Sequence, residues 1–223
     1  MVKTAITKAV NTLGQAETLL NLSRSVDPTF FREWHQALPP LTATEMAQVD
    51  RIRSRYRYHR QIGHLAEGVV NLVVLSPLLE LAGFYDPPFQ LRAERSVTLD
   101  IAPVSPELEG QILQGRMDFL VVQDSLWLAV LESKGTDLNL EDGIPQALAY
   151  MCGSPQRNPV YGMVTNGGQF VFLKLERSFG LQGVSQYDLS SLFSHLPLQN
   201  QLYEVLQILK GLKAQLELET TPE

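Results

Sequence analysis

An acid and an amine two residues apart, Glu132 and Lys134, have the types and spacing that could serve the hydrolysis of a phosphate ester. Side chains alternate along a β-strand, so both would project from one face while Ser133 points to the other. An isolated pair of this kind is more often a simple ion pair at the end of a strand. Whether the pair takes part in catalysis therefore depends on the residues beside it.

A second carboxylate is expected next to this pair. The apolar runs 116–122 and 126–132 are separated by three polar residues, which predicts a β-hairpin centred near Ser125. Such a hairpin would bring Asp118 opposite Glu132 or within one place of it, where Cβ atoms lie about 4.5–5.5 Å apart. Two carboxylates would then converge on one point.

Two converging carboxylates suit Mg²⁺ or Mn²⁺, because Mg²⁺ prefers oxygen ligands at about 2.0–2.1 Å and keeps several waters. A backbone carbonyl and a substrate phosphate would complete the coordination. The metal would polarise the phosphoryl oxygen and lower the pKa of a bound water, which attacks the phosphodiester in line. The ammonium of Lys134 would position that water and offset the charge of the transition state.

Three short segments stand in the order and approximate spacing of the motifs of one nuclease superfamily. They are GRMD at 115–118, ESK at 132–134 and QALAY at 146–150. The sequence thereby resembles the PD-(D/E)XK superfamily, specifically its RecB-like branch, with its G-x-x-D strand, (D/E)-x-K strand and Q-x-x-x-Y helix. Segment 159–175 also resembles the strand-turn-strand of the N-terminal nuclease domain of type I restriction motor subunits. One departure is Met117, where the family often has proline.

The resemblance implies a role for each matching residue. By it, the catalytic residues are Asp118, Glu132, Lys134, Gln146 and Tyr150, and the metal ligands are Asp118, Glu132, the carbonyl of Ser133 and, as a weaker match on a preceding helix, Glu67. Gln146 and Tyr150 are four residues apart and share one helix face, from which the family orients the substrate or the lysine.

The elements that must position these residues follow from changes of hydrophobic period along the chain. Helices are expected at 3–24, from Thr42 through a run of arginines, at 59–84 with Pro77 bending or restarting the helix, at 141–151 and at 200–218; strands are expected at 91–101, 116–122, 126–132, 160–165 and 169–175. From residue 59 onward the order is helix, three strands, helix, two strands, helix.

The expected fold is therefore α/β, with a restriction-endonuclease-like mixed β-sheet core flanked by helices and extra helices at both termini. Residues 1–58 are expected to form a helical N-terminal extension and 59–175 the nuclease-like core, which is the part that the resemblance covers. Residues 176–223 are expected to form a C-terminal loop and helix packed on the core.

The charge balance gives mixed signals about a nucleic-acid partner. The net charge of −6 argues against one, because phosphate binding usually leaves a basic footprint. A local cluster points the other way: it comprises Arg51, Arg53, Arg55, Arg57 and Arg60 with Tyr56, Tyr58 and His59. Cations interleaved with stacking surfaces suit nucleic acid, although a charge run is as often a solvated helix face. We expect this cluster to edge the active-site cleft as the main phosphate contact.

The start of the chain and its cysteine content favour a cytoplasmic protein. Lysines and polar residues interrupt the first 20 residues, unlike a secretory signal, and the most apolar stretch, Val69–Leu81, is shorter than the ~20 residues of a membrane span. The single cysteine, Cys152, excludes an internal disulfide and fits a small buried side chain better than a nucleophile.

Two functions remain open from the sequence. The first is a Mg²⁺- or Mn²⁺-dependent nuclease that cleaves DNA, as a homo-oligomer or with a separate specificity or motor subunit, since the chain has no G-x-x-x-x-G-K-[ST] motif. The second is a catalytically inactive domain of the same fold that binds nucleic acid or serves as a scaffold. The sequence does not distinguish DNA from RNA, or endonuclease from exonuclease.

Overall fold

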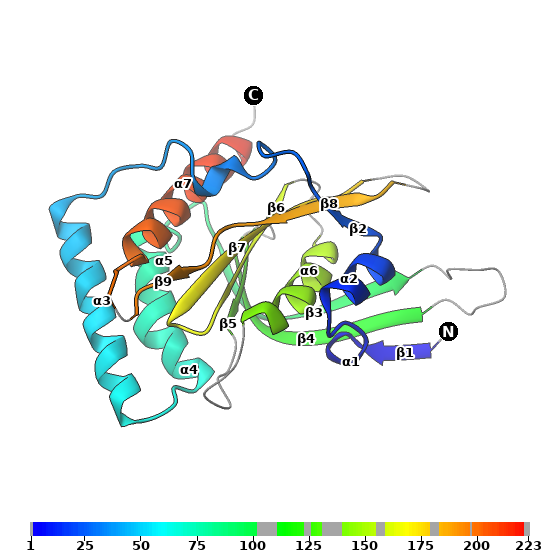
Figure 1. Ribbon diagram of the computed structural model, residues 1–223, viewed down its shortest axis with the longest axis horizontal. Coiled ribbons are helices and arrows are strands. Elements are labelled where there is room, and N and C mark those ends of the chain that lie inside the picture. The colour runs from blue at the N-terminus through cyan, green and yellow to red at the C-terminus, as the bar shows by residue number, and fades with distance from the viewer. Residues whose placement is uncertain are drawn as a thin grey trace.

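The computed structural model describes residues 2–101, 111–122, 126–130, 140–154, 159–178, 183–196 and 198–220. Within these ranges nine strands form one mixed sheet with helices on both faces, so the fold is mixed α/β (Figure 1). The main path through the sheet is β1-β4-β5-β6-β7-β8-β2, while β3 pairs with β4 and β9 with β7.

The strands are β1 (Val2–Ala5), β2 (Leu22–Arg24), β3 (Leu91–Ile101), β4 (Gln111–Val122), β5 (Leu126–Val130), β6 (Val160–Thr165), β7 (Gln169–Glu176), β8 (Ser185–Leu189) and β9 (Phe193–Ser194). The helices are α1 (Ile6–Ala9), α2 (Leu13–Leu20), α3 (Ala43–Ile62), α4 (Glu67–Val70), α5 (Ser76–Ala82), α6 (Ile144–Cys152) and α7 (Leu202–Thr220), with 3-10 turns η1 (Arg32–Trp34) and η3 (Leu140–Asp142) and the π-helical turn η2 (Asn71–Leu75). None of the helices in the described ranges is long and apolar enough to cross a membrane.

Both faces of the central strands are buried, which explains why β6 and β7 are apolar almost throughout. Tyr161 and Met163 belong to the core under α3, α5 and α7. Val160 and Val164, which alternate with them along β6, belong to the core under α1, α2 and α6. Figure 1 shows these two helical layers on opposite sides of the sheet.

Helix α3 forms where its capping signal predicts it. The Thr42 hydroxyl accepts a hydrogen bond from the Glu45 backbone N–H at 3.2 Å, and a Glu45 carboxylate oxygen accepts one from the Thr42 N–H at 2.7 Å. This capping box satisfies two otherwise unpartnered donors at the helix start. The buried side chains Val49, Ile52 and Tyr56 recur at helical intervals and hold α3 on the core.

The segment from α4 to α5 accommodates a proline inside a helical path. Pro77 lacks a backbone N–H, and its ring conflicts with the carbonyl four residues earlier. The π-helical turn η2 comes immediately before, and α5 restarts at Ser76 with the proline in its first turn. The chain therefore stays helical across Pro77, with the π-helical turn as the irregularity before it. The expectation of one helix over 59–84 is wrong, because α3 ends at Ile62 and the helical path begins again only at α4.

The expectation of a purely helical N-terminal extension over residues 1–58 is wrong. Two strands from this region enter the sheet: β1 runs parallel to β4, with Thr4 beside Leu113, and β2 runs parallel to β8, with Leu22 beside Ser185. The C-terminal segment 176–223 likewise contains β8 and β9 where a loop was expected, whereas α7 packs on the core as predicted. These short strands are stabilised by partners far away in the sequence, which local periodicity does not reveal.

The β4–β5 hairpin exists, but its pairing is shifted by two residues from the one expected, so that the register directs Asp118 toward residue 130 and not toward residue 132 or its immediate neighbours. Val122 pairs with Leu126 and Phe119 with Ala129, so the hairpin is centred on residue 124 rather than near Ser125. The three turn residues themselves lie outside the described part of the chain.

Candidate functional site

The predicted metal ligand Asp118 lies at an irregularity of strand β4. The register between β4 and β3 shifts by one residue between Ala93 and Arg95, so that Asp118 and Phe119 are set against a single residue of β3. This is the arrangement of a β-bulge, a feature that is frequent beside active sites because it bends a strand and re-aims a side chain. The described structure thus gives the backbone position of Asp118, whereas its side chain lies outside the described part.

The other members of the predicted triad lie just beyond the described part of β5. Glu132, Ser133 and Lys134 belong to residues 131–139, which the structure does not describe. The last described residue before them, Val130, pairs in parallel with Thr165 at the end of β6. Ligands of α/β sheets commonly bind outside the carboxyl ends of parallel strands, and the predicted E-x-K sequence directly follows such an end.

Helix α6 carries both residues of the predicted Q-x-x-x-Y motif. Tyr150 is fully buried and Gln146 is half-buried on a helix that is otherwise almost entirely in the core. Burial raises the pKa of Tyr150 to about 12, so its hydroxyl keeps its proton near neutral pH. Any part that this side chain takes in a site is that of a neutral hydrogen-bonding group and not of a base.

The turn 166–168 fixes the carboxyl end of β6 against the α3–α5 layer. Gly167 has φ +84°, and a methyl group in its place would lie 2.8 Å from Cγ1 of Val70 and 2.8 Å from the ring of Tyr56. His195 is fully buried beside the turn, with Nε2 2.7 Å from the Gly167 carbonyl oxygen. Burial lowers the pKa of His195, which favours the neutral ring with Nε2–H as donor.

The same turn relates the weaker candidate Glu67 to the predicted site. Glu67 is half-buried and opens α4, three residues before Val70, which contacts Gly167. The start of α4 therefore lies near the carboxyl end of β6, and β6 is the neighbour of β5 in the sheet. Glu67 and the carboxyl end of β5 thus lie at the same end of the sheet, although α4 and α6 cover opposite faces.

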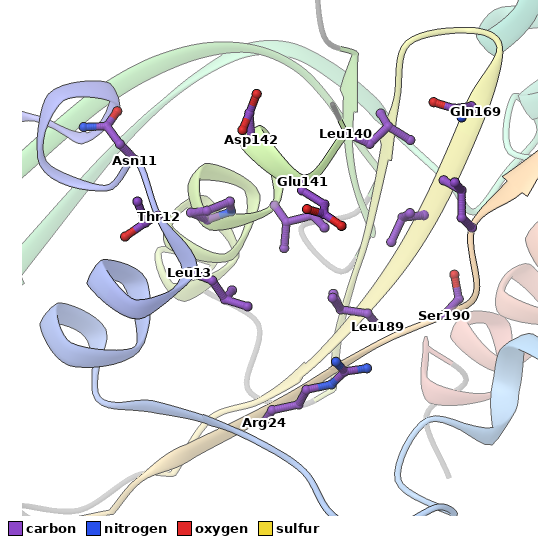
Figure 2. A pocket seen from close by; sticks show the side chains of 14 residues that line it. Asn11, Thr12, Leu13, Arg24, Leu140, Glu141, Asp142, Gln169, Leu189 and Ser190 are labelled. Carbon is purple, nitrogen blue, oxygen red and sulfur yellow. The ribbon is translucent and has the colours of Figure 1, made fainter. Parts of the chain in front are cut away.

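A cavity of about 620 Å³ opens at this end of the sheet on the α6 side (Figure 2). Its lining includes Leu140, Glu141 and Asp142 of η3, which directly follow the undescribed segment 131–139. Arg24 also lines the cavity, and its Nε donates to the Asp188 carboxylate at 2.9 Å. The two exposed carboxylates in the lining, Glu141 and Asp142, make the cavity a poor site for a phosphate and a better one for neutral or cationic groups.

The predicted phosphate-binding cluster on α3 divides into residues with different surroundings. Arg53 donates from Nε to the His195 carbonyl at 2.9 Å and from Nη2 to the carbonyls of Leu198 and Gln199 at 3.1 and 3.2 Å. The ring of Tyr56 is buried, so it contributes to the core and not to the surface. The remaining members are Arg51, Arg55, Arg57 and Tyr58, which are exposed, and His59 and Arg60, which are half-buried. The Arg60 Nη1 lies 3.4 Å from the Gly63 carbonyl oxygen.

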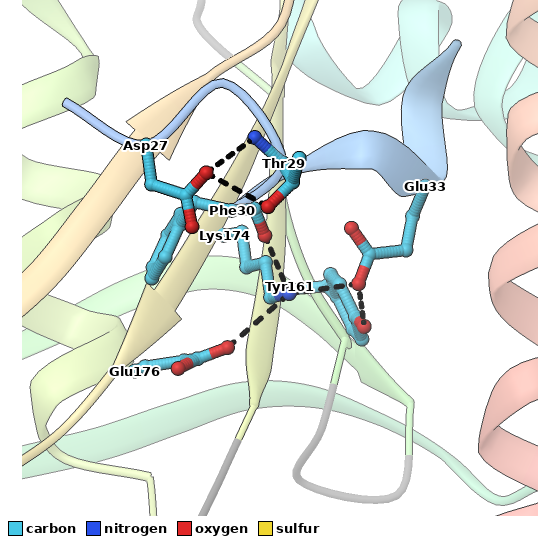
Figure 3. A network of polar contacts seen from close by, with 7 residues as sticks. All are labelled: Asp27, Thr29, Phe30, Glu33, Tyr161, Lys174 and Glu176. Carbon is cyan, nitrogen blue, oxygen red and sulfur yellow. Dashed lines mark hydrogen bonds and ion pairs between the residues drawn. The ribbon is translucent and has the colours of Figure 1, made fainter. Parts of the chain in front are cut away.

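A buried ion network was not anticipated from the sequence (Figure 3). The Lys174 ammonium donates to the Phe30 carbonyl at 2.7 Å and to a Glu33 carboxylate oxygen at 2.8 Å, and it lies 3.2 Å from Glu176. Tyr161 donates to the same Glu33 oxygen at 3.1 Å. A single lysine inside the apolar strand QFVFLKLE was the available signal. The network binds the segment that contains η1 to β6 and β7, so we assign it to stability.

The side chains of the described residues contain no group of three or more His, Cys, Asp or Glu that could hold a metal ion. The side chains of the predicted ligands Asp118 and Glu132 lie outside the described part of the chain. No protein-family model matches the chain, and a search of curated proteins finds no match to it. A function is therefore inferred from the residues of the chain and from their positions in the fold.

Proposed function

We propose that the chain is a metal-dependent nuclease that hydrolyses phosphodiester bonds of DNA. One observation supports this above the others: Asp118 lies at a β-bulge of β4, next to β5, whose carboxyl end leads into Glu132 and Lys134. A bulge is an irregularity that strands keep where a side chain must be aimed, and here it falls on the acidic residue singled out by the motif.

The arrangement of the sheet supports a restriction-endonuclease-like core. Strands β3, β4 and β5 are consecutive and antiparallel, and α6 then connects β5 to the parallel neighbour β6. Helices α4 and α5 precede this unit on one face, and α6 covers the other. This is a mixed sheet flanked by helices in the order that the motifs require.

In this proposal Asp118, Glu132 and the Ser133 carbonyl hold Mg²⁺ or Mn²⁺, with Glu67 as a further candidate. The bound ion supplies a polarised phosphoryl oxygen and an activated water. Lys134 stabilises the charge that develops on the phosphoryl group. Gln146 and the neutral hydroxyl of Tyr150 orient the lysine or the substrate through hydrogen bonds.

One metal ion shared by Asp118 and Glu132 requires that the two carboxylates lie close together. The register of the hairpin takes Asp118 toward Val130, two residues before Glu132. If the strand continues, Asp118 and Glu132 become diagonal neighbours with Cα atoms about 7–8 Å apart, from which two carboxylates can still meet. A structure in which these carboxylates lie more than about 8 Å apart would contradict the shared ion, whose ligand bonds are near 2 Å.

Two substitutions separate metal binding from chemistry. Asp118→Asn removes an anionic ligand, so Mg²⁺ affinity should fall and part of the lost cleavage should return at high Mn²⁺ concentration. Lys134→Ala removes a cation beside the ion, so metal should bind as well or better while cleavage still fails. Calorimetric titration with Mg²⁺ and a DNA cleavage assay on the same preparations measure both effects. If both variants cleave DNA at the parental rate, the assignment of Asp118 and Lys134 to the active site is wrong.

A second candidate is a catalytically inactive binding or scaffold domain in the same cytoplasmic setting, and it would fit a subunit that acts with a separate partner chain. The net charge of −6 and the two carboxylates that line the cavity, Glu141 and Asp142, favour it. Calorimetry distinguishes the two candidates, because a scaffold that has lost its chemistry need not bind Mg²⁺ through Asp118.

A further inference from the structure

The C-terminal half of helix α3 carries a stripe of exposed residues. Residues 51, 55, 58 and 62 follow one another at intervals of four, three and four, which places them on one helix face. The buried residues Val49, Ile52 and Tyr56 occupy another face. Two arginines at the start of the stripe are thus followed by Tyr58, which is 63% exposed, and Ile62, which is 75% exposed.

The two arginines of this stripe differ from Arg53 in how they are used. The guanidinium of Arg53 donates hydrogen bonds to three backbone carbonyls, those of His195, Leu198 and Gln199. Within the part of the chain that the structure describes, the guanidinium groups of Arg51 and Arg55 make no hydrogen bond or ion pair. Their cationic groups are therefore available for a partner, and their guanidinium forks suit phosphate oxygens.

Arg51 and Arg55 also border a hollow. A cavity of about 210 Å³ between α3 and α5 is lined by both arginines, by Gln48 and Ile52 of α3, and by Pro77, Glu80 and Leu81 of α5. One carboxylate, Glu80, faces two guanidinium groups in this lining, so the local charge is positive in a chain whose net charge is −6. The hollow gives the arginines a concave setting in which an anionic group can be enclosed.

We infer that the stripe formed by Arg51, Arg55 and Tyr58 binds single-stranded nucleic acid. The arginines contact consecutive phosphates, and the exposed ring of Tyr58 stacks on a base. Stacking selects a single strand because bases within a duplex already stack on one another. The inference rests on the proposed function for the class of substrate, and it assigns strand preference to a surface remote from α6, which packs on the other face of the sheet.

Fluorescence anisotropy with labelled single- and double-stranded DNA of the same sequence tests the inference. The titrations are done with chelator present, so that cleavage does not enter the measurement. The double variant Arg51→Glu/Arg55→Glu should bind single strands at least about tenfold more weakly and with a smaller salt dependence. Tyr58→Ala should weaken single-strand binding about tenfold and leave duplex binding unchanged.

Two further variants serve as controls. Arg32→Glu reverses an exposed arginine of η1 and should leave binding close to that of the parent. Arg53→Glu removes the hydrogen bonds to segment 195–199 and should lower the melting temperature, whereas the stripe variants should melt like the parent. A stripe variant that binds single strands as tightly as the parent, or a parent that binds no single-stranded DNA, overturns the inference.

The outcomes are distinguishable from a failure of the proposed function. If the parent protein binds single strands through the stripe but cleaves no DNA with Mg²⁺, the binding surface is supported and the proposed nuclease activity is contradicted. If the parent cleaves DNA and the stripe variants bind single strands as the parent does, the nuclease activity is supported and the binding surface is contradicted. Equal losses for single strands and duplexes in Tyr58→Ala would remove the assigned strand preference.

Discussion

Replacing Lys174 by methionine should destabilise the fold more than any other single loss of a lysine charge in the described chain. Methionine keeps most of the apolar stem and deletes the ammonium. The side chains of Lys174 and Glu33 are only 9% and 12% exposed, so the deletion leaves the Glu33 carboxylate without its cation in a largely dry setting. The Phe30 carbonyl loses its donor as well. Breaking one side of a buried ion pair typically costs about 3–5 kcal/mol, and we expect Lys174→Met to fall in that range.

Urea denaturation of the parent and the variants measures this cost. The matched control is Lys213→Met, because Lys213 pairs with Glu217 where the two side chains are 28% and 36% exposed. That change should cost no more than about 0.5 kcal/mol. Adding Glu33→Gln to Lys174→Met should recover at least about 2 kcal/mol, since neutralising both partners removes the stranded charge. Equal losses in the two methionine variants would refute the assignment of Lys174 to a buried ion network.

Local geometry also determines how stability responds to changes at Glu45 and at two glycines. Hydrogen bonds from Lys210 and from the N–H of Thr42 lower the pKa of Glu45 from 4.5 to about 2. The stabilising contribution of Glu45 is therefore complete above pH 4.5 and is lost as the pH falls toward 2, so the stability gap between parent and Glu45→Gln should close over that interval in urea titrations. Gly167→Ala should lower stability by at least about 1 kcal/mol, because φ is +84° and the added methyl group would overlap Tyr56. Gly14→Ala, which has nothing within 4 Å, should be neutral or slightly stabilising in thermal melts.

The elements recovered from the sequence are those whose side chains repeat with a clear period over many residues. Strands β3 and β6 begin and end where alternation and turn residues predict them, and α3 begins at its capping box. The short strands β1 and β2 were not recovered, because three or four residues carry little periodicity and their partners β4 and β8 lie far away in the chain. Local patterns report burial, whereas strand pairing between distant segments depends on the whole fold.

The same limit applies to individual side chains. Lys174 is visible as a single charge in an apolar strand, but its partner Glu33 is 141 positions away, and nothing in the sequence joins them. The arginines of α3 were predicted as one cluster, and their environments divide them: Arg53 holds a backbone segment, whereas Arg51 and Arg55 border a hollow. The β-bulge at Asp118 also depends on pairing with β3 and has no signature in the motif itself.

The proposed activity is metal-dependent phosphodiester hydrolysis that depends on Lys134. The most direct measurement is incubation of purified protein with single- and double-stranded DNA in the presence of Mg²⁺, Mn²⁺ or chelator, with Lys134→Ala beside the parent. We expect DNA cleavage by the parent with either metal, no cleavage with chelator and none by Lys134→Ala. Intact DNA under every condition, or cleavage by Lys134→Ala at the parental rate, would contradict it.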